Sequence, residues 1–218
     1  MTVSDKRIAE SVLILKNILS GLFPVLTVIA YANDLPPLTT LAWSSLIATI
    51  FFIVLVTVRK EWKDNVANTK ALKDILLSIF FIAVIYHFLF FLSLEFTSPQ
   101  NVSLLGTMEI VFGFIILGLI FKREPVSRNH FIGAMLMFVS AGMILLQNKT
   151  AFNIGDLIIL VAVAIAPIGN IFSKRALHQV SLSYLLFMRS LGAAIIFFIA
   201  AYMFEGIITT DILITSIP

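Results

Sequence analysis

Seven apolar runs of helix length dominate the sequence. They span residues 11–32, 38–58, 75–94, 102–121, 130–147, 155–172 and 183–204. None alternates polar and apolar residues with the period of two that a membrane strand requires. The chain is 60% hydrophobic and 12% charged, with a mean hydropathy of +1.05, far from the composition of a soluble domain. We therefore predict an all-α, polytopic transmembrane bundle of about seven helices embedded in a lipid bilayer.

The lysines and arginines collect in alternate loops. Of 15 such residues, 13 lie before or at the start of the first run, or after the second, fourth and sixth runs; the others are Lys149 and Arg189. Because short cytoplasmic loops carry the excess of cations, we predict a multi-pass protein of the cell (cytoplasmic) membrane. Its N-terminus is then cytoplasmic and, after seven crossings, its C-terminus lies outside. The first run is too long for a cleavable signal and stays as a membrane helix.

Composition also excludes several classes of protein. A formal net charge of +3 invites nucleic acid as a partner, but the cations sit in short loops that orient helices, so we predict no nucleic-acid binding. The absence of cysteine removes disulfides and thiolate chemistry. Three scattered histidines do not make a metal site, and no nucleophile motif appears. We expect no enzyme activity, no cofactor and no metal.

Glu109 is the one carboxylate within the fourth run, at a depth where an ionised group is costly unless it faces a partner, water or the bundle interior. It is therefore a functional-site candidate. At helical spacing Ser103, Gly106 and Gly113 fall near the same face. Small residues there either admit a neighbouring helix closely or leave room for a cavity.

His87 lies in the third run at about the depth of Glu109, because each is seven residues from its end of the connecting turn, about 10 Å at the helical rise. If both side chains point inward, the pair shares a proton and forms a coupling site. The alternative is a neutral His87 hydrogen-bonded within an aromatic core. The rotation of each helix about its axis decides between these two interpretations.

Three further polar residues lie within apolar runs. Arg189 either snorkels back to the interface or contacts a substrate or a carboxylate. Asn17 and Asn170 occupy the first and sixth runs, where hydrogen bonding between helices is the usual role and ligand contact the less common one.

Pro24 and Pro167 lie within the first and sixth runs, at similar places in "LFPVLTVIA" and "IAPIGNIFS". Proline removes a helical hydrogen bond and kinks the helix. Because these runs are five helices apart, the second would cross in the opposite sense, as in an inverted repeat whose interrupted helices form a transport site. The alternative is that prolines are simply common in membrane helices.

A family resemblance joins several of these positions. Thr97, Ser98, Glu109, Glu124, Ile132, Gly133 and Gly142, followed by Gly155, Asp156 and Arg189, occur in an order that resembles the EamA-type drug/metabolite transporter superfamily. The resemblance implies two five-helix repeats, of which residues 1–150 make the first and residues 151–218 supply two helices and a short tail of the second. It also places Gly133 and Gly142 at helix-packing positions. Ile110 replaces the proline that usually follows the glutamate, which removes the expected cause of a helix distortion there.

The resemblance implies a carrier that moves small polar or amphiphilic metabolites by efflux and by alternating access, without a cofactor and with protons as the candidate counter-ion. Glu109 would then bind a substrate cation or a proton, and the helices of Pro24 and Pro167 would flex. The alternative is a non-transporting truncated carrier or a membrane scaffold for assembly. With the later helices missing, we expect the face of Gly106 and Gly113 to be open or covered by a second copy in a homo-oligomer.

Overall fold

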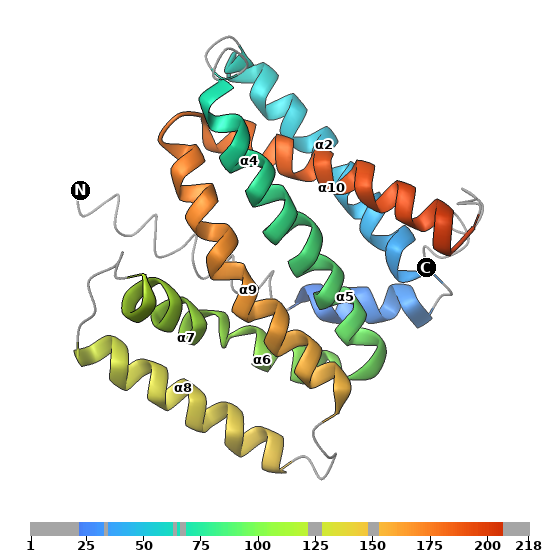
Figure 1. The fold of residues 1–218 in the computed structure, drawn as a ribbon. Coiled ribbons are helices and arrows are strands. Elements are labelled where there is room, and N and C mark those ends of the chain that lie inside the picture. The colour runs from blue at the N-terminus through green and yellow to red at the C-terminus, as the bar shows by residue number, and fades with distance from the viewer. Residues whose placement is uncertain are drawn as a thin grey trace.

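The computed structural model describes residues 22–32, 35–62, 65, 69–121, 128–147 and 153–206, and every regular element in that part of the chain is helical. The elements are Leu22–Ala32, α2 (Pro37–Val58), η1 (Thr69–Ala71), α4 (Leu72–Ser78), η2 (Ile79–Tyr86), α5 (His87–Phe96), α6 (Pro99–Gly106), α7 (Glu109–Gly113), η3 (Phe114–Ile120), α8 (Arg128–Gln147), α9 (Ile154–Leu177) and α10 (Leu182–Phe204). Figure 1 shows them as one bundle. The predicted fold class is confirmed.

Five helices in the described ranges are long and apolar enough to span a membrane: Pro37–Val58, Leu72–Phe96, Pro99–Gly118, Ile154–Leu177 and Leu182–Phe204. Two shorter apolar helical stretches, Leu22–Ala32 and Phe131–Ser140, fall within the first and fifth predicted runs. Large apolar side chains are exposed along these helices, as on Ile47 and Tyr202 at 63% and 70% of their surface. Such exposure suits helices whose outer faces contact lipid.

The third span is a single apolar helix made of α4, η2 and α5, and its middle is wound as a π-helix. Figure 1 shows it in green between α10 and α9. A π-helix has about one extra residue per turn, so it widens the helix locally and is frequently found at functional sites. Two glycines of neighbouring helices face this wide segment: Gly169 of α9 lies against Ile82, and Gly192 of α10 lies against Ile79.

Helices α2 and α10 cross and pack along one another (Figure 1). The α2 helix begins with Pro37 at its first position, where the missing N–H costs nothing. Glu205, just after α10, accepts hydrogen bonds from the N–H groups of Leu38 and Thr39 at 2.7 and 2.8 Å. Its negative charge lies at the positive end of the α2 dipole, so one side chain joins the end of α10 to the start of α2.

Helix α9 packs against the third and fourth spans, and it continues without interruption through Pro167. Asn153 and Asp156 form a capping box at its start. Asp156 is 1% exposed and also accepts from the Thr97 hydroxyl at 2.6 Å and the Asn101 amide at 3.2 Å. This buried carboxylate thus fixes the start of α9 against the turn between the third and fourth spans.

The fourth span is the broken one. Between α6 and α7 the backbone forms a turn at Thr107 and Met108, whose N–H groups bond to carbonyls three residues back, at 3.1 and 3.0 Å. The Thr107 hydroxyl also donates to the carbonyl of Leu104 at 2.6 Å. These tight bonds shift the helix out of its α register just before Glu109. The helix is therefore distorted beside Ile110 although no proline stands there, so the expectation of an undistorted helix was wrong. The 3₁₀ hydrogen bonds distort the helix without a proline.

Helix α8 lies at the edge of the bundle beside α6 and α7 (Figure 1). None of its side chains that the structure describes is fully buried. A Cβ added at Gly106, Gly113, Gly133 or Gly142 would meet nothing within 4 Å in the described chain. The packing role of these four glycines and the open face at Gly106 and Gly113 therefore stay predictions. Gly155, against the backbone of Ser93 and Thr97, is the glycine at a close contact.

Candidate functional site

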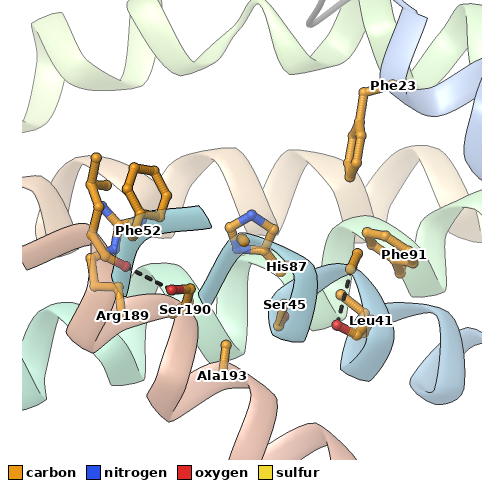
Figure 2. A pocket seen from close by; sticks show the side chains of 13 residues that line it. Phe23, Leu41, Ser45, Phe52, His87, Phe91, Arg189, Ser190 and Ala193 are labelled. Carbon is orange, nitrogen blue, oxygen red and sulfur yellow. Dashed lines mark hydrogen bonds between the residues drawn. The ribbon is translucent and has the colours of Figure 1, made fainter. Parts of the chain in front are cut away.

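A cavity of about 230 Å³ lies between the first described helix, α2, the third span and α10. Figure 2 shows the side chains around it. They are Phe23, Leu41, Ser44, Ser45, Ala48, Phe52, Ala83, His87, Phe91, Leu186, Arg189, Ser190 and Ala193. The small residues Ala48, Ala83 and Ala193 leave the space, because each faces the cavity from a different helix.

The cavity has a charged end and an aromatic end. Figure 2 shows Arg189 and Phe52 together at one end, Phe23, Leu41 and Phe91 at the other, and His87 between them. On α2 the distance from Leu41 to Phe52 corresponds to about 16 Å at the α-helical rise. A cavity of this length and polarity suits an elongated molecule with one polar end.

Arg189 is the one lysine, arginine or carboxylate among the residues that line the cavity. Its Nε atom is buried and has no hydrogen-bond partner in the described part of the chain. An unpaired cation inside an apolar bundle is costly and is typical of a substrate or ion pathway. Sequence analysis left snorkelling open for Arg189, and the structure places it in the cavity wall.

His87 follows the π-helical segment and lines the middle of the cavity. Its Nδ1 lies 2.7 Å from the carbonyl oxygen of Ile82, five residues back. Because a carbonyl only accepts, Nδ1 carries the hydrogen and donates it, which fixes the orientation of the ring. Arg189 is the charged side chain that lines the same cavity as His87.

Glu109 lies elsewhere, where α7 meets α9. It accepts a long hydrogen bond of 3.4 Å from the Asn170 amide. Glu109 and His87 share no hydrogen bond in the described structure, and His87 bonds to the carbonyl of Ile82 instead, which is the second of the two interpretations left open by the sequence. The physical reason is the direction of the side chains: His87, directly after the π-helical segment, lines the cavity with residues of α2 and α10, whereas Glu109 meets Asn170 of α9.

The remaining predicted residues are spread through the bundle. Asn170 meets Glu109, as the role in hydrogen bonding between helices predicts. Pro24 and Pro167 are fully buried, and Pro24 adjoins the cavity residue Phe23. Asn17 lies outside the described residues. Within those residues no group of three His, Asp or Glu side chains is placed to hold a metal ion.

Sequence reasoning missed an aromatic cluster at the end of the cavity. The Phe23 and Phe91 rings lie 5.6 Å apart, and the Tyr31 hydroxyl donates to the carbonyl of Phe91 at 3.1 Å. Tyr31 also lines a second, wide depression of about 570 Å³, together with Leu94 and Glu95. The aromatic cluster therefore separates the cavity from this depression. In the sequence, the aromatic residues of this cluster cannot be told from residues that face lipid. The signal for a cavity wall on α2 was the pair of polar residues Ser44 and Ser45 within an apolar run.

Fold and site together define a multi-pass helical membrane protein with a partly polar cavity among its spans. The profile of the EamA-like transporter family matches residues 7–146, more than half of the chain. The chain belongs to this family, a family of transporters and not of enzymes. No match was found among curated proteins or among solved structures.

Proposed function

We propose that the chain is a carrier that moves small polar or amphiphilic metabolites out of the cell by alternating access. The observation that carries this proposal is the 230 Å³ cavity, which has a charge at one end and four helices around it. Helices that enclose a mid-membrane site and can rock about it are the basis of alternating access. The two repeats predicted from the sequence, residues 1–150 and 151–218, both contribute to its walls.

The cavity suits an outward direction. Arg189 lies about 10 Å along α10 from its start at Leu182, and this end of α10 follows the last turn of α9, which carries Lys174 and Arg175. By the distribution of cations this is the cytoplasmic side, with the N-terminus on the same side. The polar end of the cavity would then admit substrate from the cytoplasm, and the aromatic cluster of Phe23, Tyr31 and Phe91 would close the external end. Pro24, beside Phe23, is placed to let this closure move.

Glu109 is proposed as the group that takes up a proton or a cation during transport. It stands directly after the break in the fourth span and is half-buried. Its partner is one amide at 3.4 Å, and no lysine or arginine in the described chain forms an ion pair with it. An ionisable side chain at this depth of a membrane span, with one weak partner, is a candidate for a functional role. In this proposal Arg189 serves binding and Glu109 serves coupling.

The cavity is tested by filling it. Ala48→Phe places a ring inside the cavity, whereas Ile47→Phe places the same ring on a side chain that is 63% exposed. With the 218-residue protein in proteoliposomes, we expect flux of at least one member of a panel of metabolites. Ala48→Phe should abolish that flux and Ile47→Phe should preserve it. Equal flux in both variants would remove the cavity from the pathway.

A second candidate function rests on the open face of the fourth span. A Cβ added at Gly106 or Gly113 would meet nothing within 4 Å in the described chain, so both positions have room for a further side chain. Such a face suits a truncated carrier or a scaffold that binds another membrane helix, including that of a second copy. Absence of flux for every solute, together with cross-linking between cysteines introduced at Gly113, would favour this candidate.

A further inference from the structure

We propose that the cavity binds an amphiphilic organic anion, with its oxyanion head group at Arg189 and its apolar body along Phe23 and Phe91. This inference deepens the proposed function and rests on it, because it names the substrate class of the same site.

The first argument is that no carboxylate in the described chain lines the cavity with Arg189. In the described chain the embedded or buried carboxylates are engaged elsewhere: Asp156 with Thr97 and Asn101, Glu205 with the start of α2, and Glu109 with Asn170. None lines the cavity. Burying a guanidinium away from water without an anion beside it costs about several kcal/mol. A ligand that brings the anion removes this cost at the moment it binds.

The second argument is the geometry of the donors. A guanidinium presents a planar fork of N–H groups that fits the two oxygens of a carboxylate or a phosphate. The Ser45 hydroxyl, on the facing α2, has no hydrogen-bond partner in the described chain and is free to donate. The hydroxyls of Ser190 and Ser44 are already engaged. They donate to the carbonyls of Leu186 at 2.9 Å and of Leu41 at 3.0 Å.

The third argument is the other end of the cavity. Phe23, Leu41 and Phe91 lie beyond His87 and offer apolar and aromatic surface without a charge (Figure 2). A small inorganic anion would leave this surface against empty space or water. An anion with an aromatic or aliphatic body fills it and gains the free energy of apolar burial. Charge and shape therefore indicate the same class of molecule.

The test compares three probes of one skeleton: 4-phenylbutyrate, 4-phenylbutylamine and 4-phenylbutanol. Their dissociation constants are measured by calorimetry with the full chain in nanodiscs of zwitterionic lipid. We expect 4-phenylbutyrate to bind about tenfold or more tightly than the alcohol, and the amine to bind most weakly, because only the anion pairs with Arg189. Arg189→Gln should abolish the preference, and Arg189→Lys should keep it with lower affinity.

Arg175→Gln is the matched control, because Arg175 is exposed on α9 with its guanidinium 5.7 Å from the ring centre of Phe172, outside the cavity. It should bind like the parent chain. Equal binding of the three probes, or an unchanged preference in a folded Arg189→Gln variant, would overturn the inference. If Arg189→Gln does not fold, an affinity for 4-phenylbutyrate that Arg189→Lys does not lower would overturn it as well. Failure of the carrier proposal is seen separately, as anion binding without any flux in proteoliposomes.

Discussion

Arg189 and Glu109 are both ionisable side chains within apolar spans, yet their surroundings differ. Arg189 faces a cavity among the tightly packed helices α2, α10 and the third span, and its Nε has no partner in the described chain. Glu109 stands in the loosely covered region of α7, α8 and α9, beside Asn170. Arg189 thus has a cavity beside it and an Nε without a partner in the described chain. Glu109 has one weak partner and lies at a break in its helix. The proposed function assigns the two side chains to separate steps because their surroundings differ in this way.

Separating binding from coupling gives the largest expected effect. Glu109→Gln keeps the size and the bond to Asn170 but removes the titratable group. We expect uptake driven by a proton gradient to fall by about tenfold or more, while exchange of substrate without a gradient stays within about twofold. Both fluxes are measured in proteoliposomes. Glu95→Gln, an exposed position at the end of α5, is the control. An equal loss of exchange would place Glu109 in binding and erase the distinction.

The packing of the two regions is compared with two glycines. Gly155→Ala adds a Cβ at 2.8 Å from the carbonyl oxygen of Ser93 and from the Thr97 nitrogen, backbone atoms that cannot give way. We expect the free energy of unfolding to fall by about 2–3 kcal/mol, as for overpacking of a tight core. Gly133→Ala on α8 meets open space and should raise it by up to about 1 kcal/mol through helix propensity. Titration with denaturing detergent measures both. Similar effects at the two sites would show that α8 is packed as closely as α9.

The joint between α2 and α10 belongs to the cavity region and can be weakened alone. Glu205→Gln removes the charge that accepts from two N–H groups at the start of α2 and from the Thr39 hydroxyl at 2.7 Å. We expect a loss of about 1–2 kcal/mol in the free energy of unfolding, because a charged acceptor at a helix N-terminus is replaced by a neutral one. A thermal melt in detergent detects it. No change would mean that packing along the two helices holds them without this bond.

The smallest expected effect concerns the aromatic end of the cavity. Tyr31→Phe keeps the ring against Phe91 and removes one hydrogen bond of 3.1 Å to its carbonyl. We expect a loss of about 1 kcal/mol in stability, together with a faster leak of substrate through the external end. Thermal melts and efflux from preloaded proteoliposomes measure these effects. Phe88→Leu, at an exposed position of α5, serves as the control and should change neither. If the leak is unchanged in Tyr31→Phe, the hydrogen bond from Tyr31 to Phe91 does not contribute to closing the external end of the cavity.

Local composition determined the spans. The predicted runs at 38–58, 155–172 and 183–204 correspond to α2, α9 and α10 within a few residues, because an apolar stretch of that length has no other stable form in a bilayer. The order of short motifs around Glu109 and Arg189 sufficed to indicate the family that the profile match then showed. A departure from the family motif did not predict the local backbone: Ile110 replaces the usual proline, and the helix is nevertheless broken beside it.

Only the tertiary structure decided which polar groups meet. Successive residues of a helix point about 100° apart, so one extra residue in a π-helical turn redirects every side chain that follows. That segment, at Ile79–Tyr86, turned His87 away from Glu109 and toward Arg189 and α2. A sequence states depth along a helix, which is why His87 and Glu109 looked like partners. Facing depends on the packing of glycines such as Gly169 and Gly192 against the wide turn, and this packing arises only when the helices come together.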